Sequence, residues 1–283
     1  MAVKPLSEKA LARKYAETGW SQDTIAFLHD FFLAGANLYG VCTVQDLWDI
    51  YKFLGEHVSL PKLRRRDMIT FSAIARRDRL PYAVYEIDEI YADEERKETE
   101  RMIVHKELVG SGYYRFDDVY RLSDRQLNKP FYVPDDYMRY AEPEPSPAES
   151  ALRGYLDELQ GMTAHSRTAA AEELFRQLRR AVMTGFPDTS HAIRMLTDQL
   201  NETGTGPDEE ETLKLLELVT AYNNSSHLWL NRGWAPQDMR QPAGTAPTLV
   251  LGPDIKKMLA ENGISEDEFL AVLAGRGINT LKS

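Results

Sequence analysis

The chain has 283 residues, of which 43% are hydrophobic and 28% are charged, a balance typical of a soluble globular protein rather than a disordered one. This length allows one large hydrophobic core or two ordinary ones. The net charge of −10 is uneven: residues 1–140 carry 21 Lys and Arg against 23 Asp and Glu, whereas residues 141–283 carry 13 against 21. The second half is therefore a poor match for a polyanion, because its field would repel phosphates.

The sequence also bears on the cellular compartment. No apolar run is long enough to span a membrane, and the charged N-terminal stretch lacks the apolar centre of a secretory signal. Cys42 is the only cysteine in the sequence, which excludes an internal disulfide and a multi-cysteine zinc site. We expect a cytoplasmic protein without a membrane partner, in which Cys42 is a small buried thiol.

The first half of the chain begins with clear helix signals. Ser21 precedes a run of apolar residues at helical spacing that ends near Gly40. After a short β-like stretch, Thr43 caps a second helix that ends at Gly55. These signals predict two helices separated by a short strand.

A third helix and a hairpin are predicted next. Ser59 and Pro61 mark the start of the helix, which continues to residue 78. Two strand-like runs follow at 82–91 and 101–109, and the charged run 93–100 joins them. The order of helix, short strand, two helices and hairpin is that of a winged helix, in which the third helix can enter the major groove of DNA.

The predicted third helix is basic. Residues 60–80 hold seven Lys and Arg against two Asp. At 100° per residue the apolar residues Leu60, Leu63, Phe71 and Ile74 fall on one side. The candidate nucleic-acid face falls broadly on the other side, together with Ile69 and Ala73, and consists of Lys62, Arg65, Arg66, Arg76 and Arg77. The predicted hairpin is acidic, however, and acid there would repel the flanking phosphate. Winged helices also serve as protein-binding modules, so both interpretations stay open.

The segment YAEPEPSPAES, residues 140–150, divides the chain. Its three prolines among glutamates and small residues predict a semi-extended linker. We therefore expect a mainly α protein with a small α+β part. Its expected regions are an N-terminal arm at 1–20, a winged-helix-like α+β domain at 21–139, the linker at 140–150, and an all-helical domain at 151–283.

Hydrophobic periodicity predicts a series of helices in the second half. Their expected positions are 148–160, 166–183, 189–201, 208 to the low 230s, 253–262 and 265–274. In the fourth, the predicted buried stripe consists of Leu213, Leu216, Val219 and Thr220.

Residue types that carry catalysis do not form a recognisable pattern. None of the six histidines pairs with another at i, i+4 spacing, and there is no G-x-S-x-G motif. His29 lies on an apolar helix, where we expect a satisfied histidine in or beside the core. The acid pairs Asp117–Asp118 and Asp135–Asp136 point apart in helix or strand, so neither makes a bidentate metal site alone. We expect no catalytic residue, no metal and no cofactor.

The stretch YNNSSHLWLNRGW, residues 222–234, stands out in the second half. Asn and Ser are weak helix formers, and packing alone does not require a run of them. We expect a set of five residues to converge in one place: Tyr222, Asn223, Asn224, Trp229 and Trp234. Two interpretations remain open, a buried polar network and the floor of a groove for a partner or ligand.

This stretch resembles a Tyr-Asn-Asn-Thr/Ser…Trp-x-Asn-x-Gly-x-x-Pro motif of uncharacterised bacterial proteins. The match covers Tyr222 to Asn224, Trp229, Asn231, Gly233 and Pro236, with Ser225 in place of the more usual threonine. Some of those proteins join the motif to a SEC-C zinc segment, which this chain lacks because it has a single cysteine. The resemblance implies a bacterial, cytoplasmic protein and implies no activity.

These observations favour a non-enzymatic interaction or regulatory protein that binds a protein partner through the helical domain. The alternative is a winged-helix DNA-binding protein that uses the basic third helix. The two interpretations differ in salt dependence, because phosphate contacts release counterions and weaken steeply with salt.

Overall fold

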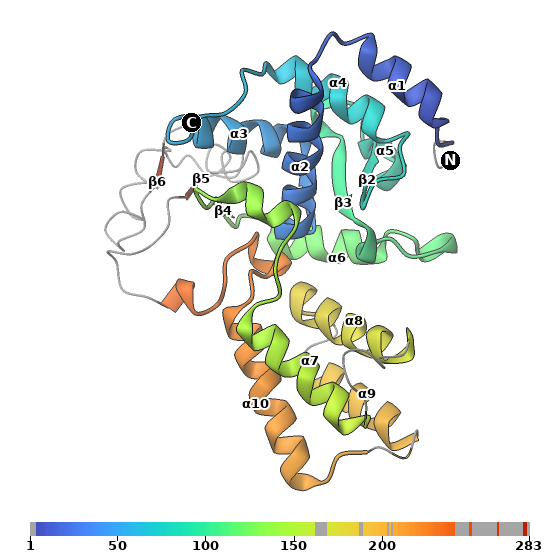
Figure 1. Cartoon of the computed structure of the whole chain (residues 1–283), viewed down its shortest axis with the longest axis vertical. Coiled ribbons are helices and arrows are strands. Elements are labelled where there is room, and N and C mark those ends of the chain that lie inside the picture. The colour runs from blue at the N-terminus through green and yellow to red at the C-terminus, as the bar shows by residue number, and fades with distance from the viewer. Residues whose placement is uncertain are drawn as a thin grey trace. The chain divides into compact units, whose positions relative to one another are not determined.

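The computed structural model describes residues 4–161, 169–186, 189–202, 204, 206–240, 249–250, 265 and 280–281. The described chain is mainly helical and contains a small three-stranded antiparallel sheet, as the sequence predicts (Figure 1). It forms two compact units: the first comprises residues 1–143 and 242–283, and the second comprises residues 144–241. The second unit is therefore inserted into the chain of the first.

Local capping signals place the first helices where the sequence predicts them. Helix α2 (Gln22–Tyr39) begins after Ser21, whose side chain accepts from Thr24 N, and ends at Gly40 with a positive φ of 72°. Strand β1 (Val41–Thr43) leads into α3 (Val44–Gly55), where Thr43 and Asp46 form a reciprocal capping box. A further helix, α1 (Glu8–Ala16), lies in the segment predicted as an arm.

The third predicted helix is shorter than expected. Helix α4 (Arg65–Ala75) begins several residues after Pro61. The preceding segment is held in a non-helical course by Tyr51: its hydroxyl donates to Pro61 O and accepts from Leu63 N at 3.0 Å. A tertiary contact from α3 thus overrides the helix-start signal at Ser59 and Pro61.

The predicted strands pair, although both are shorter than predicted. Strands β2 (Tyr82–Tyr85) and β3 (Met102–His105) are antiparallel, with Tyr85 opposite Met102, and β1 pairs with the other edge of β3, giving the order β1-β3-β2. Between β2 and β3 the chain forms a one-turn helix, α5 (Ile87–Ile90). Glu86 and Glu89 form a capping box there, so the run predicted as strand turns helical after Tyr85.

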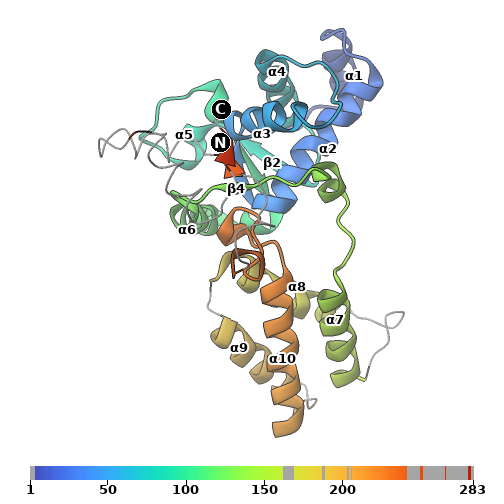
Figure 2. The ribbon, with the colours of Figure 1, turned by 90° about the vertical axis from the view of Figure 1, so that its left-hand side faces the viewer.

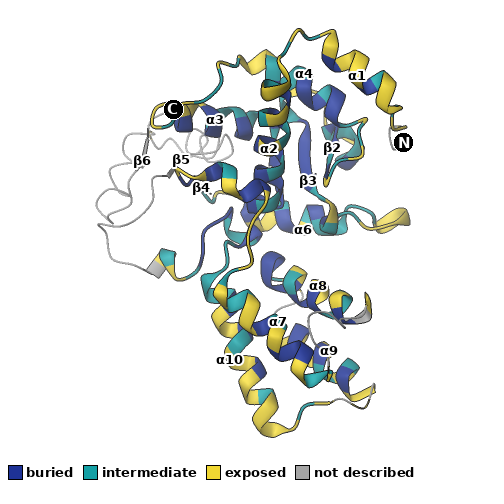
Figure 3. Cartoon of the chain, in the orientation of Figure 1, coloured by how far each residue is buried: buried dark blue, intermediate teal, exposed yellow. Residues whose placement is uncertain are grey.

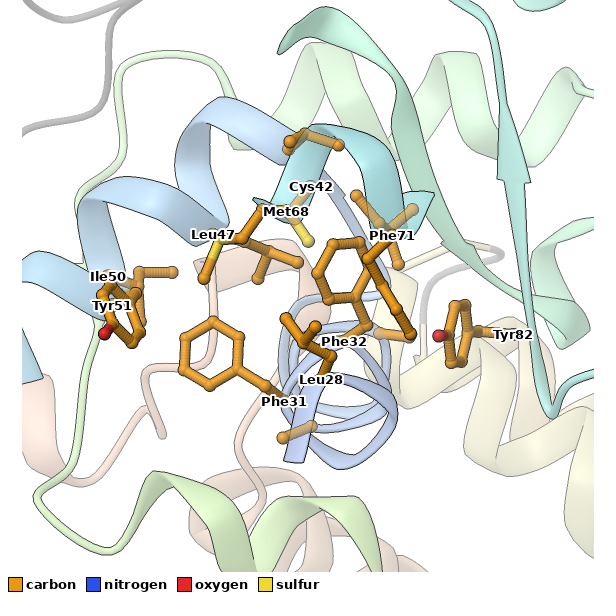
Figure 4. Packing of buried hydrophobic residues seen from close by; sticks show 14 of the residues in the cluster. Leu28, Phe31, Phe32, Cys42, Leu47, Ile50, Tyr51, Met68, Phe71 and Tyr82 are labelled. Carbon is orange, nitrogen blue, oxygen red and sulfur yellow. The ribbon is translucent and has the colours of Figure 1, made fainter. Parts of the chain in front are cut away.

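Helix α2 forms the centre of the hydrophobic core of the first unit. Its side chains Leu28, Phe31 and Phe32 are fully buried, and Figure 4 shows them between the side chains of α3 and α4. The rings of Phe32 and Phe71 meet edge to face with centroids 4.8 Å apart. Cys42 is buried in the same core, as the sequence predicts.

The second unit contains four helices among its described residues: α7 (Pro147–Leu159), α8 (Ala169–Thr184), α9 (Thr189–Glu202) and α10 (Glu209–Ser225). Helix α10 packs along α7, and α8 packs against α9 (Figures 1 and 2). Helix α10 ends at Ser225, earlier than the predicted low 230s, and the short 3₁₀ turn Trp229–Asn231 follows. The weak helix formers of the Asn-Asn-Ser-Ser run occupy its last turn.

The buried face of α10 also differs from the prediction. Leu215, Val219 and Tyr222 are buried, whereas Leu213 is 58% exposed and Leu216 is 38% exposed. Val219 alone belongs to both stripes. Leucines at 213, 215 and 216 allow either helical phase, and packing against the neighbouring helices selects the one through Leu215.

The end of the chain departs from the predicted all-helical domain. Strand β5 (Leu249–Val250) pairs antiparallel with β4 (Phe131–Tyr132) and parallel with β6 (Thr280–Leu281). These pairings join β5 and β6 to β4 of the first unit. The helices predicted at 253–262 and 265–274 lie outside the described residues, apart from Ser265.

Candidate nucleic-acid interface

The N-terminal end of α4 carries an exposed basic cluster. Lys62, Arg65, Arg66 and Arg77 of the predicted nucleic-acid face are all exposed. Arg64, which was not predicted, adds a side chain that is 85% exposed and lies 3.5 Å from Asp67. Within the part of the chain that the structure describes, the side chains of Lys62, Arg66 and Arg77 make no ion pair or hydrogen bond. These cations are available to a ligand.

Arg76, the fifth predicted residue, occupies a different environment. Its guanidinium bonds Glu86 through Nη1 and Glu89 through Nη2, both at 2.6 Å, and its side chain is 12% exposed. Arg101, from the start of β3, donates to the same Glu86 carboxylate at 2.9 Å and to Ser72 of α4 at 3.1 Å. This buried network ties the end of α4 to the hairpin. Arg76 is therefore committed to the fold rather than to the exposed basic cluster.

A second hydrogen-bonded chain reaches the basic cluster from α3. Lys52 Nζ lies 2.9 Å from Asp49 Oδ1, and Gln45 Nε2 donates to Asp49 Oδ2 at 2.8 Å. Gln45 Oε1 in turn accepts from Arg65 Nη2. The sequence offered no sign of this role for Gln45, because a polar residue in the first turn of a helix is ordinary. This series of hydrogen bonds holds the side chain of Arg65, the first residue of α4, against α3.

The connection between β2 and β3 is acidic, as predicted. Asp88 pairs with Arg96 at 2.8 Å, and the hydrogen bond from Arg96 lowers the pKa of the Asp88 carboxyl. Asp93, Glu94 and Glu95 are exposed and make no ion pair within the described chain. The tip of the hairpin is thus a negative surface that would repel phosphate.

In the second unit, three of the five predicted residues are buried. Tyr222 is 2% exposed, Trp229 0% and Trp234 7%. The Tyr222 ring lies 6.1 Å from that of Phe175, and burial raises its pKa to about 12. The Arg179 guanidinium lies 5.3 Å from the Trp229 ring, a cation–π contact. These aromatic side chains hold the unit together and do not line an open surface.

The loop after α10 is closed by backbone hydrogen bonds. Leu228 O accepts from Gly233 N at 2.9 Å, and His227 Nδ1 donates to Gly233 O at 2.7 Å. Gly233 has a φ of 86°, a conformation that favours glycine. Asn224 O accepts from Gln237 N at 3.0 Å, which fixes the segment beyond the loop against the end of α10.

The two asparagine side chains are placed differently from the aromatic ones. Asn223 and Asn224 are half-buried, and neither side chain hydrogen-bonds to another residue within the described ranges. Both continue the outward stripe of Leu213, Leu216 and Thr220 along α10. The asparagine side chains are therefore not part of a buried polar network among the described residues and lie at the end of this helix face. Figure 3 shows that much of α10 is exposed.

His29 has the structural role predicted for it. Its Nε2 is hydrogen-bonded to the Tyr15 hydroxyl of α1 at 3.1 Å, and its ring meets Phe71 edge to face at 4.8 Å. Burial lowers the pKa of His29, with an opposing effect from Asp78, and burial raises the pKa of Tyr15. The pair fixes α1 to the core of the first unit.

Neither a metal site nor a membrane span is found in the described parts of the chain. No three His, Cys, Asp or Glu side chains there lie close enough together to hold a metal ion. None of the described helices is both long and apolar enough to cross a bilayer. No protein-family model, no curated protein and no solved structure matches this chain.

Proposed function

We propose that the first unit is a winged-helix module that binds duplex DNA, with the N-terminal end of α4 in the major groove. The observation that carries the proposal is the order α2-β1-α3-α4-β2-β3 combined with the exposed arginines at the start of α4. In helix-turn-helix proteins the second helix of the pair enters the groove, and residues at its N-terminal end contact the bases. Helix α4 occupies that position.

The side chains along the outward face of α4 suit this role. Arg65 and Arg66 begin the helix, where the helix dipole adds positive potential, and Thr70 and Ala73, with short side chains, follow Arg66 on its face beside Ile69. Short side chains allow the helix to approach the base edges closely. Thr and Ala also make apolar contacts with the thymine methyl group.

The acidic hairpin restricts the mode of binding. Because Asp93, Glu94 and Glu95 would repel a flanking phosphate, contact is made by α4 and the segment before it rather than by the hairpin tip. The whole chain carries a net charge of −10. We therefore expect weak binding to unrelated DNA and a strong dependence on salt.

Fluorescence anisotropy of the full chain with a labelled duplex tests the proposal across a range of salt concentrations. Binding should weaken as salt rises, with a linear relation between log K and log salt. The double substitution Arg65→Glu and Arg66→Glu should abolish binding and changes the net charge from −10 to −14. The matched control, Arg139→Glu with Arg176→Glu, makes the same change at exposed positions elsewhere and should leave binding largely intact. Absence of binding by the unaltered protein at low salt would reject the proposal.

A second candidate function is protein binding by the second unit, and the outward stripe of α10 favours it. Leu213 and Leu216 are exposed on one helix face that continues to Asn223 and Asn224, whose side-chain amides make no hydrogen bond to any described residue. A row of exposed apolar side chains along one helix face is a surface that a protein partner could cover.

In-cell photocrosslinking tests this second candidate. A photoreactive amino acid at Leu216 should capture one defined protein, whereas the same amino acid at Leu127, which is 55% exposed in the first unit, should not. The capture should disappear when Leu213→Asp is added. Identical crosslinking patterns at both positions would count against a specific partner of α10.

A further inference from the structure

We propose that Gln45 is a positioning residue that holds Arg65 ready to bind a guanine in the major groove. The inference rests on the DNA-binding function proposed above and deepens it, since it names the kind of base that α4 recognises. Arg65 is the first residue of α4 and is exposed, while Gln45 lies in the first turn of α3.

The orientation of the Gln45 amide follows from its partners. The Asp49 carboxylate can only accept hydrogen bonds, so the Gln45 NH₂ group must face it, at 2.8 Å. The Gln45 carbonyl oxygen is thereby turned towards Arg65, whose guanidinium can only donate. Lys52, 2.9 Å from the other Asp49 oxygen, neutralises the carboxylate, so that it does not repel an approaching phosphate. In this hydrogen-bonded series Asp49 orients Gln45, and Gln45 in turn orients Arg65.

The hydrogen bond to Gln45 leaves the guanidinium able to read a base. A guanidinium has five N–H donors, and the bond from Nη2 to Gln45 uses one of them. The second Nη2 hydrogen and those on Nη1 and Nε remain for a bidentate contact with O6 and N7 of guanine, the commonest specific contact in the major groove. Because Arg65 is already ordered, less conformational freedom is lost when it binds.

Arg66 provides the internal contrast. Its side chain is exposed and has no hydrogen bond or ion pair within the described residues. An arginine that no neighbouring side chain holds in one orientation suits a phosphate, which presents charge without demanding one geometry. We therefore assign base recognition to Arg65 and phosphate contact to Arg66.

Selection from a randomised duplex library with the full-length protein, followed by anisotropy on single-base variants of the selected duplex, tests the inference. The unaltered protein should require guanine at one position. Arg65→Lys keeps the positive charge but removes the planar guanidinium that can donate two parallel hydrogen bonds. This variant should therefore lose the guanine preference, while the salt dependence of its affinity should stay unchanged. Gln45→Leu should reduce the preference at least about 5-fold while leaving affinity for unrelated DNA unchanged, within the range that one bidentate contact supplies. Gln22→Leu, an exposed glutamine at the start of α2, is the control and should change neither quantity.

The outcomes separate the two proposals. Salt-dependent binding without a guanine preference, or a preference that survives either Gln45→Leu or Arg65→Lys, overturns the inference and leaves DNA binding standing. Absence of salt-dependent binding overturns the proposed function, and the inference falls with it. Thermal unfolding of each variant shows whether a lost preference reflects lost folding, and Arg65→Lys, at an exposed position, supplies the test if Gln45→Leu unfolds.

Discussion

Gly35 of α2 lies close to Leu47 and Tyr137, and its replacement by alanine tests the packing of the first unit. A Cβ at this position would lie 2.7 Å from Leu47 Cδ2 and 2.9 Å from the Tyr137 hydroxyl oxygen. Non-bonded carbon atoms prefer a separation of about 3.5–4.0 Å. Leu47 and Tyr137 are buried, at 0% and 1% exposure, so neither side chain can move into solvent. We expect Gly35→Ala to destabilise the unit.

The expected change in the free energy of unfolding is the sum of two destabilising contributions and one stabilising contribution. Overpacking of a dense core costs about 1–3 kcal/mol. Displacement of the Tyr137 hydroxyl weakens its hydrogen bond to Phe31 O, now 3.2 Å long, and such a bond contributes about 1 kcal/mol. Against these terms, alanine is favoured over glycine inside a helix by about 1 kcal/mol. The net expectation is a loss of about 1–3 kcal/mol in the free energy of unfolding.

Gly55→Ala is the matched control within the same unit. Gly55 is the last residue of α3, and a Cβ there would meet nothing within 4 Å. The same substitution should therefore stabilise the unit by about 0.5–1 kcal/mol. Urea unfolding followed by circular dichroism gives both differences, and hydrogen exchange of peptides from α2 assigns them to the first unit. If Gly35→Ala stabilised the unit as Gly55→Ala does, the close packing of Leu47 and Tyr137 against Gly35 would be refuted.

Three further predictions concern the buried ion network, pH and the face of α10. Arg101→Ala should cost about 1–3 kcal/mol of unfolding free energy, because it removes the bonds of Arg101 to Glu86 and Ser72 while Arg76 still pairs with Glu86. Arg96→Ala breaks an exposed pair and should change stability little; urea titration measures both. Since burial lowers the pKa of His29, its neutral form is favoured in the fold. The stability it contributes is complete above its ordinary pKa near 6.5 and is lost as the pH falls through the lowered value, so His29→Gln should flatten the fall in urea midpoint between pH 7 and pH 5. Leu215→Ala should destabilise the second unit by about 2–5 kcal/mol and Leu216→Ala by less than about 1 kcal/mol, and equal losses in thermal melts would contradict the helical phase described above.

Some features of the fold can be predicted from short segments of the sequence. Ser21, Thr43 and Gly40 act on their own neighbours through caps and a positive φ, so the ends of α2 and the start of α3 are predictable without knowledge of the tertiary structure. The order α2-β1-α3-α4-β2-β3 follows from the same kind of signal. The exposed basic cluster at the start of α4 is predictable too, because charged side chains rarely leave the surface unless they are paired.

Other features depend on partners that are distant in the sequence. Arg76 looks like a surface cation until Glu86 and Glu89, ten and thirteen residues away, bury its charge. Gln45 is unremarkable until the turn after α3 brings Arg65, twenty residues later, against its carbonyl oxygen. Such pairings depend on how the helices and strands pack against one another. They cannot be predicted from residue type or from hydrophobic periodicity.

The second unit shows the same limit for hydrophobic residues. Periodicity identifies α10 as an amphipathic helix, but leucines at 213, 215 and 216 satisfy two phases almost equally well. The choice falls to the neighbours that α10 packs against, which bury Leu215 and leave Leu216 partly exposed. Local signals in the sequence specify that a helix forms here and where it begins. Packing against the neighbouring helices selects which of its faces is exposed, because burial depends on the shape of the surfaces that meet.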